Sequence, residues 1–227
     1  MDLKNLSSAG FSSGKALLVF DLDGTLLDTM HDIQAAVNVA LSKQGKQALP
    51  LEAVTQMVGN GVSVLARKAL AGTGDEAAFL QDYHAYYRAH LYDKTVPYPG
   101  IPALIDRLSK QGYKLAVLSN KPQAETERLI EAFFPQGLFA MVWGQTEERP
   151  KKPDPKAPLA LAKLLSFSSE QCVMIGDSDV DMQTAKAAGF FPLGVTWGYQ
   201  SKETLQTAGA KILVNSENEL ANVLIFS

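Results

Sequence analysis

Two pairs of aspartates are the residues of this chain best suited to do chemistry together. Asp21 and Asp23 follow one apolar run, and Asp177 and Asp181 follow another, far along the chain. Each apolar run predicts a buried strand, and ligands bind at the carboxyl ends of strands in an open α/β sheet. Carboxylates this close repel one another unless a cation lies between them. The alternative for the first pair is an ordinary strand followed by an Asx turn.

Polar residues near other predicted elements would complete the chemistry of phosphoryl transfer. Ser119 and Asn120 follow a predicted strand, Lys152 lies in a charged, proline-rich loop, and Thr25 adds a hydroxyl beside the first aspartates. An aspartate can be the nucleophile and a second carboxylate the general acid and base. Lysine, hydroxyl and amide groups can stabilise the phosphoryl oxygens, and Mg²⁺ prefers oxygen ligands. Taken alone, Ser119 would rather cap the next helix, and Lys152 would be an ordinary surface lysine.

The elements that must position these residues alternate between strand and helix over residues 1–28 and 95–227. Such alternation predicts right-handed crossovers and a parallel sheet, so that distant polar clusters meet at one edge. Residues 29–94 instead show only helical periodicity. The sequence therefore predicts an α/β fold with a Rossmann-like parallel-sheet core, discontinuous over 1–28 and 95–227, and an inserted all-helical cap over 29–94. The strands are predicted at 16–20, 113–118, 141–143, 172–175, 191–195 and 212–214.

Within the helical segment, Asp75 is expected to cap a helix that carries a stripe of tyrosines, which we interpret as core packing. The chain has three histidines, all in this segment, and no cysteine or paired spacing lies beside them. We therefore expect surface positions rather than a metal site for His31, His84 and His90.

Four motifs together resemble those of the haloacid dehalogenase-like hydrolases, most of which are magnesium-dependent phosphatases. Residues 21–25 read Asp-Leu-Asp-Gly-Thr, as in the first family motif. Ser119-Asn120 is similar to the second motif, Lys152 in Lys-Pro-Asp-Pro to the third, and residues 176–181 to the fourth. The motifs occur in the family's order, and the resemblance covers nearly the whole chain.

The resemblance implies a role for each matching residue. Asp21 would be the nucleophile and Asp23 the acid and base. The metal, Mg²⁺, would be bound by Asp21, Asp177 and the main-chain oxygen of Asp23, and Asp181 would act through water or another ligand. The residues implied to bind phosphate are Thr25, Ser119, Asn120 and Lys152.

Within the family, several stretches resemble the phosphoglycolate phosphatase branch: residues 58–62, 119–122, 176–189 and 196–199. Relatives in that branch tend to have arginine where this chain has Lys68, and a lysine cannot form the bidentate contact of arginine with a carboxylate. We take Asn60, Arg67 and Lys68 as candidates for substrate specificity. The alternative for the glycine-flanked Asn60 is a simple turn between helices.

The leading hypothesis is a Mg²⁺-dependent phosphomonoesterase that acts on a small phosphorylated metabolite, with 2-phosphoglycolate as the first guess. A sugar phosphomutase of the β-phosphoglucomutase type is one alternative, because it shares the nucleophile and the acid and base. A non-catalytic small-molecule binding protein on the same fold is another. The presence of Asp21, Asp23, Lys152 and Asp177 argues against it, because such repulsion is useful only for catalysis or metal binding.

Composition excludes several other classes of protein. The 227 residues include 46% hydrophobic residues, and the formal net charge of −3 leaves no basic surplus for nucleic acid. No apolar run is long enough to span a bilayer, and residues 1–15 predict neither a signal peptide nor an anchor. The single cysteine cannot form an internal disulfide. We therefore expect a cytoplasmic protein without membrane partners, either a monomer or a homodimer.

Overall fold

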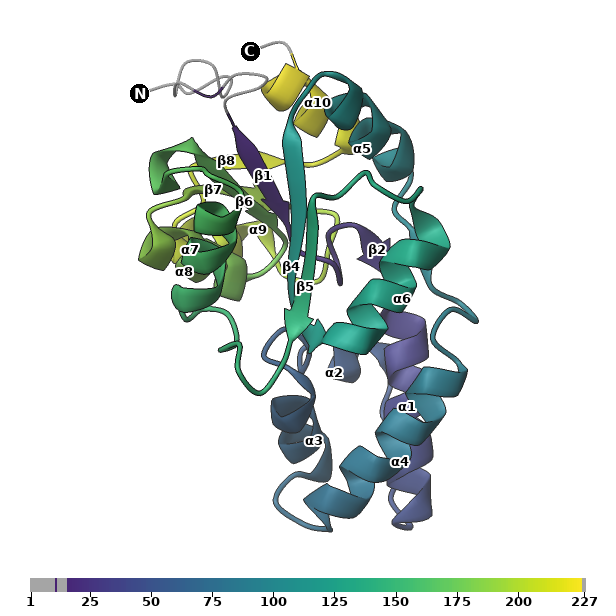
Figure 1. Ribbon diagram of the computed structural model, residues 1–227. Helices are drawn as coiled ribbons and strands as arrows, with labels where there is room; N and C mark the ends of the chain where they lie inside the picture. The colour runs from purple at the N-terminus through teal and green to yellow at the C-terminus, as the bar shows by residue number, and fades with distance from the viewer. Residues whose placement is uncertain (1–10, 12–15, 226–227) are drawn as a thin grey trace.

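The core of the protein is a six-stranded sheet in which every neighbouring pair of strands is parallel (Figure 1). The structure, a computed structural model, describes residue 11 and residues 16–225; the rest of the amino-terminal stretch, with its prediction of no signal peptide, lies outside the described part. The strand order is β5-β4-β1-β6-β7-β8. The strands are β1 (Leu17–Phe20), β4 (Lys114–Pro122), β5 (Met141–Gln145), β6 (Cys172–Gly176), β7 (Phe191–Val195) and β8 (Ile212–Val214).

Helices cover both faces of this sheet, which confirms the predicted α/β fold class. In β1, Leu18 and Phe20 belong to one buried cluster, and Leu17 and Val19 belong to the other. Burial on both faces explains why the central strands read as continuous apolar runs. The helices of the core are α5 (Ile101–Lys110), α6 (Gln123–Phe133), α7 (Lys156–Leu164), α8 (Asp179–Ala188), α9 (Lys202–Ala208) and α10 (Glu217–Ile225), with a 3₁₀ turn at Ser169–Gln171.

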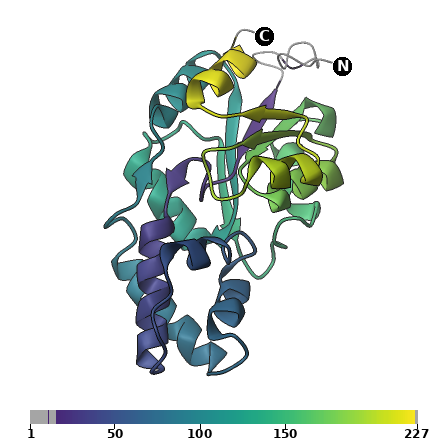
Figure 2. The same cartoon turned by 180° about the vertical axis from the view of Figure 1, so that it is seen from behind.

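Four helices occupy residues 29–94, and this segment contains no strand. They lie beyond the end of the sheet, as seen from both sides in Figures 1 and 2. Asp75 caps the last of them as predicted, because its carboxylate accepts a hydrogen bond of 3.0 Å from the backbone N–H of Ala78. The helices are α1 (Met30–Lys43), α2 (Leu51–Thr55), α3 (Val62–Leu70) and α4 (Glu76–Ala89). The division of the chain into two domains stays a prediction.

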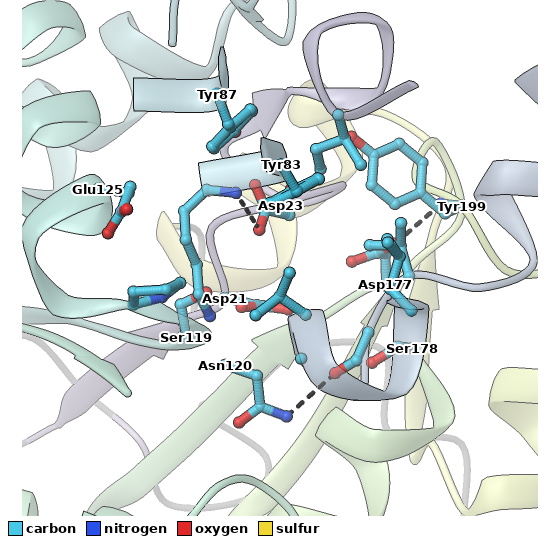
Figure 3. A pocket seen from close by; sticks show the side chains of 18 of the residues that line it. Asp21, Asp23, Tyr83, Tyr87, Ser119, Asn120, Glu125, Asp177, Ser178 and Tyr199 are labelled. Carbon is cyan, nitrogen blue, oxygen red and sulfur yellow. Dashed lines mark hydrogen bonds and ion pairs between the residues drawn. The ribbon is translucent and has the colours of Figure 1, made fainter. Parts of the chain in front are cut away.

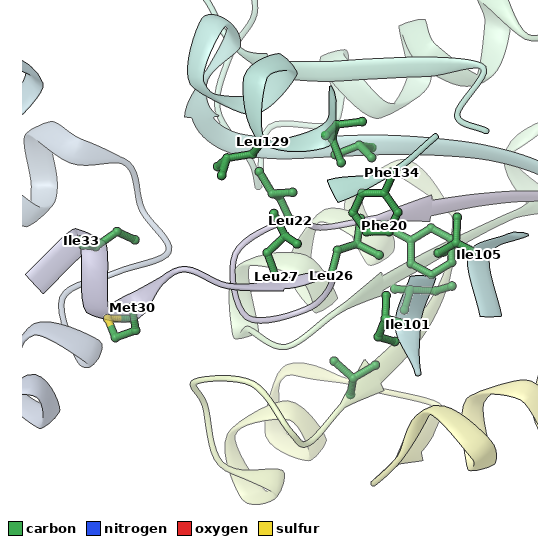
Figure 4. Close-up of a cluster of buried hydrophobic side chains, with 14 of the residues drawn as sticks. Phe20, Leu22, Leu26, Leu27, Met30, Ile33, Ile101, Ile105, Leu129 and Phe134 are labelled. Atoms are coloured by element: carbon green, nitrogen blue, oxygen red, sulfur yellow. The ribbon is translucent and has the colours of Figure 1, made fainter. Parts of the chain in front are cut away.

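The larger buried cluster runs continuously from the sheet into the helical segment. Figure 4 shows Phe20 packed among side chains of α5 and α6, with Leu26 and Leu27 leading on to Met30 at the start of α1. The side chains of Phe20, Leu26, Leu27 and Met30 are each at most 3% exposed. The helical segment is therefore joined to the core through apolar packing as well as through its two connecting strands.

Those two connections pair with each other in a way that the sequence did not predict. Strand β2 (Leu27–Asp28) and strand β3 (Val96–Pro97) form a short antiparallel pair. Strands of two residues carry no periodic pattern, and residues 95–100, with two prolines, indicate only a linker. Nearby, the buried Asp32 of α1 accepts hydrogen bonds from the backbone N–H of Lys94 at 3.0 Å and from that of Thr95 at 2.8 Å. The hydroxyl of Thr95 donates a further bond to the same carboxylate at 2.8 Å.

Strand β4 is longer at its carboxyl end than the predicted 113–118. It continues through residues 119–122, and its pairing with β5 becomes irregular between Leu118 and Pro122. The polar residues Ser119 and Asn120 thus lie on the strand itself rather than after it. Among the described residues, no helix is long and apolar enough to cross a membrane.

We expect Asp32→Asn to lower the free energy of unfolding by about 1–3 kcal/mol, because an amide nitrogen then faces backbone donors that lose their acceptor. Urea unfolding of the wild type and the variant measures the difference. Asp106→Asn is the matched control, since Asp106 forms only an exposed ion pair with Lys110. Equal stability of the wild type and Asp32→Asn would show that this carboxylate does not hold the second connection in place.

Candidate active site

The polar clusters that follow β1, β4 and β6 meet at the carboxyl ends of these strands. Asp21, Asp23, Ser119, Asn120 and Asp177 line one cavity, with a volume of about 70 Å³ (Figure 3). Residues of the helical segment line its other side. The parallel sheet therefore brings the predicted clusters together, as parallel topology requires.

A buried lysine lies between two of the aspartates. The Nζ of Lys152 is 2.8 Å from Oδ1 of Asp21 and 2.7 Å from Oδ1 of Asp181. Carboxylate oxygens of Asp21, Asp177 and Asp181 lie within 4.8 Å of one another, and all three residues are buried. Three carboxylates around one ammonium group could hold a metal ion, because the lysine cannot balance their combined charge.

Burial and mutual repulsion shift the pKa values of this cluster. Burial and the charge of Asp181 raise the pKa of Asp21 to about 7, against the opposing effect of Lys152. Burial, with the charges of Asp181 and Asp21, raises the pKa of Asp177 well above its ordinary value. Burial lowers the pKa of Lys152, but the two neighbouring carboxylates outweigh it and leave the pKa above its usual range. A cation with oxygen ligands would relieve this repulsion.

Lys152 is held in position through its backbone by Asn120. The amide oxygen of Asn120 accepts a hydrogen bond of 2.7 Å from the backbone N–H of Lys152, and its amide nitrogen donates one of 3.0 Å to the carbonyl of Lys152. The same amide nitrogen donates a bond of 3.0 Å to the carbonyl of Gly59 in the helical segment. Asn120 therefore links the carboxyl end of β4 to the loop of Lys152 and to the turn at Gly59.

Asp23 has two close partners, one of them a buried lysine. Oδ2 of Asp23 lies 3.0 Å from the Nζ of Lys121, and Oδ1 accepts a hydrogen bond of 2.6 Å from the hydroxyl of Thr29. Lys121 is buried. A lysine that follows polar residues at a strand end carries no signal of burial, because only the tertiary structure supplies its partner.

Asp177 is oriented by two donors from other parts of the chain. The hydroxyl of Thr25 donates to Oδ1 of Asp177 at 3.0 Å, and the backbone N–H of Tyr199 donates to Oδ2 at 2.8 Å. In this arrangement Thr25 positions Asp177 and does not line the cavity, so that phosphate binding by Thr25 stays a prediction. Ser119 does line the cavity, and its hydroxyl accepts a bond of 3.2 Å from the backbone N–H of Lys121.

The residues expected to determine specificity do not line the cavity. Lys68 is exposed and donates to the carbonyl of Gln56, and Arg67 is exposed beside Glu76. Asn60 lies in the turn before α3, where Gly59 and Gly61 rather than Asn60 border the cavity. Gly61 has a φ of 83°, a left-handed value that favours glycine.

The structure instead brings three other side chains to the cavity that the sequence reasoning missed. His84 and Tyr87 of α4 and Glu125 of α6 all line it. The histidine was expected at the surface and the tyrosine in the core, because helical periodicity distinguishes buried from exposed faces but not core from cavity. The spacing of three residues between His84 and Tyr87 is the one signal that places them on one helix face.

Comparison with known proteins identifies the family. The family model of the haloacid dehalogenase-like hydrolases matches residues 18–195. The chain belongs to the haloacid dehalogenase-like hydrolases. It is 36% identical over 208 residues to a phosphoglycolate phosphatase of Pseudomonas putida, covering 88% of this chain and 76% of the relative. It is 35% identical over 216 residues to a phosphoglycolate phosphatase of Colwellia psychrerythraea, covering 91% and 95%.

A solved structure of the same family agrees with this assignment. The crystal structure of a predicted phosphoglycolate phosphatase from Haemophilus somnus superposes with a TM-score of 0.87 at 26% identity, covering 93% of this chain and 98% of that one. This hydrolase is therefore a phosphatase, similar to the phosphoglycolate phosphatase branch, as the four motifs indicated.

The raised pKa of Asp21 has a cost for the metal-free hydrolase. Because folding raises the pKa from 3.8 to about 7, the wild type loses stability as the pH rises from about 4 to about 7. Asp21→Asn removes this cost. We expect the variant to be more stable than the wild type by about 2–4 kcal/mol near pH 8, with the difference vanishing near pH 4. Urea unfolding of both proteins in chelator at pH 4 and pH 8 measures the difference in the free energy of unfolding. Equal stability of the wild type and the variant near pH 8 would contradict the raised pKa of Asp21.

Proposed function

We propose that this phosphatase is a Mg²⁺-dependent phosphomonoesterase that works through an aspartyl-phosphate on Asp21. The observation that carries the proposal is the contact of 2.8 Å between Lys152 Nζ and Asp21 Oδ1, close to Asp177 at the carboxyl ends of the strands. A carboxylate approaching a dianionic phosphate needs nearby positive charge, and this arrangement supplies one fixed cation and ligands for another. The match to the four family motifs supports the same assignment.

In the proposed reaction Asp21 attacks phosphorus while Asp23 donates a proton to the leaving oxygen. The alcohol departs, and Asp23, now ionised, takes a proton from the water that attacks the aspartyl-phosphate. Inorganic phosphate leaves and Asp21 is restored. Lys152 and Ser119 are suited to bind the phosphoryl oxygens. Ser119 lines the cavity together with Asp21, and the ammonium group of Lys152 contacts Asp21. Lys121 and Thr29 hold the carboxylate of Asp23 in place.

The residues present fit a magnesium ion. Asp21, Asp177 and Asp181 are buried carboxylates, and the pKa values of Asp21 and Asp177 are raised. Together they are a hard-oxygen donor set of the kind that Mg²⁺ takes. Asp21, Asp177 and the main-chain oxygen of Asp23 would hold it, with Asp181 nearby. Bound there, Mg²⁺ would neutralise charge on the phosphoryl group.

The substrate that we propose first is 2-phosphoglycolate. The support is the name carried by relatives that are 32–36% identical to this chain over most of its length. The site itself recognises phosphate and metal through the core residues, so that choice among monoesters depends on the side chains of the helical segment.

We also propose that residues 29–94 act as a cap on a core formed by residues 1–28 and 95–227. The cavity is bordered from both parts, and β2 and β3 are the two places where the chain passes between them. A cap of this kind excludes water during phosphoryl transfer and opens to release products.

Replacement of Asp21 by asparagine and replacement of Asp23 by asparagine should impair different steps of the reaction. Asp21→Asn should abolish turnover, because an amide cannot form the acyl-phosphate. Asp23→Asn should lower kcat by about 10²–10⁴-fold, as expected for loss of an acid–base group, and phosphoenzyme should accumulate. Release of phosphate from 2-phosphoglycolate and mass spectrometry of the quenched enzyme measure the two effects. Near-normal turnover by Asp21→Asn would show that Asp21 is not the nucleophile.

Removal of the metal should abolish activity. We expect no phosphate release in excess EDTA, recovery with Mg²⁺, and no recovery with Ca²⁺. The larger ion accepts more ligands and can hold the nucleophilic carboxylate through both oxygens, which prevents in-line attack. Isothermal titration of Mg²⁺ into wild type and Asp177→Asn is the second measurement, since the variant should bind more weakly. Undiminished activity in EDTA would contradict metal dependence.

A further inference from the structure

Some side chains that line the cavity away from the metal cluster carry buried polar atoms that make no hydrogen bond. Within the described part of the chain, three buried side-chain atoms make no hydrogen bond: Nδ1 of His84, the hydroxyl of Tyr87 and Oε2 of Glu125. All three residues line the same cavity as Asp21 and Asp23. The side chain of Glu125 is 1% exposed and Tyr87 is 2% exposed. Buried polar groups are normally paired, so that three in one cavity indicate a binding site.

This group of side chains lies on the leaving-group side of Asp23. Lys121 contacts Asp23, and its Nζ also lies over the ring of Tyr87, 4.8 Å from the ring centre. In Figure 3, Tyr87 and Glu125 lie on the side of Asp23 away from Asp177. Because Asp23 is the proposed proton donor to the leaving oxygen, the carbon atoms of the leaving group would extend toward Tyr87 and Glu125.

Glu125 is the anionic member of this group. Burial raises its pKa, but the hydrogen bond and charge of Arg88 outweigh burial and lower the pKa below its ordinary value. The Nε of Arg88 lies 2.8 Å from Oε1 of Glu125, which leaves Oε2 as the free acceptor. Burial lowers the pKa of His84, against the charge of Glu125, so that its imidazole is neutral near pH 7.

The chemistry of these atoms selects the ligand. An ionised Oε2 requires a hydrogen-bond donor, and the phenol of Tyr87 can donate to the same ligand atom that Oε2 accepts from. A hydroxyl group satisfies both at once. A methyl group would leave both atoms unpaired, which is costly in a buried site.

We propose that His84, Tyr87 and Glu125 form a subsite for a hydroxyl group, so that small hydroxyalkyl phosphates are a substrate class of this phosphatase. The proposal rests on the proposed function of the same site and adds to it the recognition of the leaving group. Tyr87 and Glu125 contact the hydroxyl, and His84 borders it. With a cavity of about 70 Å³, the subsite suits a leaving group of few atoms.

Three phosphate esters of similar size test the proposal on the full chain with Mg²⁺. They are 2-hydroxyethyl phosphate, n-propyl phosphate, which has a methyl in place of the hydroxyl, and 2-phosphoglycolate. The hydroxyethyl ester should be hydrolysed with a kcat/KM roughly 10- to 100-fold above that of the propyl ester, as expected for a hydrogen bond to a charged group. Equal kcat/KM for these two esters would overturn the subsite.

Two variants separate recognition from structure. Glu125→Gln keeps an oxygen for Arg88 but removes the charge, so that kcat/KM should fall about 10-fold for the hydroxyethyl ester and stay unchanged for the propyl ester. Tyr87→Phe should lower kcat/KM for the hydroxyethyl ester alone. The matched controls are Glu127→Gln, exposed on α6, and Tyr86→Phe, which lies on α4 outside the cavity, and both should leave all three values unchanged.

The outcomes also distinguish this proposal from the proposed function. If no ester is hydrolysed, and p-nitrophenyl phosphate is not hydrolysed either, the proposed function fails. If all esters are hydrolysed but Glu125→Gln lowers the three values equally, Glu125 acts only by holding Arg88, and the subsite is overturned. If Glu125→Gln does not fold, as judged by circular dichroism, the comparison of the hydroxyethyl and propyl esters by the wild type decides alone.

Discussion

The contact of Lys152 with Asp21 and Asp181 is the interaction on which the rest of the site depends. Like charges buried at the ends of neighbouring strands repel one another, and only an opposite charge of fixed position makes their burial tolerable. The ammonium group supplies part of that charge at 2.8 and 2.7 Å. The excess of carboxylates that remains is what suits the site to a metal and a phosphate dianion.

The surrounding structure can be understood as the means of keeping that lysine in place. Asn120, on β4, clamps the backbone of Lys152 with two hydrogen bonds, and the capping box of Ser178 with Asp181 at the start of α8 fixes the opposite carboxylate. These segments lie at or after the carboxyl ends of β4, β5 and β6, at one edge of the same parallel sheet, which is why hydrogen bonds of normal length can join them. The apolar layers on both faces of the sheet keep the strand ends in register.

The two sides of the cavity differ in how completely their polar groups are paired. On the metal side, the side chains of Asp177 and Asp181 accept hydrogen bonds from fixed donors of the protein. On the side of α4 and α6, acceptors and donors remain without protein partners. A fully paired half gives rigid geometry for phosphoryl transfer, whereas an unpaired half gains its partners from the ligand. In the proposed function, the metal side carries out the phosphoryl transfer that is common to the family, and the side of α4 and α6 selects the leaving group.

The sequence by itself determined the α/β fold class, the helical segment between β2 and β3, and the identity of Asp21, Asp23, Lys152 and Asp177 as one site. Apolar runs are local signals of buried strands, and alternation with helices implies a parallel sheet. In such a sheet the residues at the carboxyl ends of the strands lie at one edge. Only the tertiary structure decided that Lys121 is buried against Asp23, that Thr25 contacts Asp177 and that Glu125 pairs with Arg88 of α4 beside the cavity. Helical periodicity tells which face is covered but not what covers it, because burial of a polar side chain depends on partners far away in the sequence.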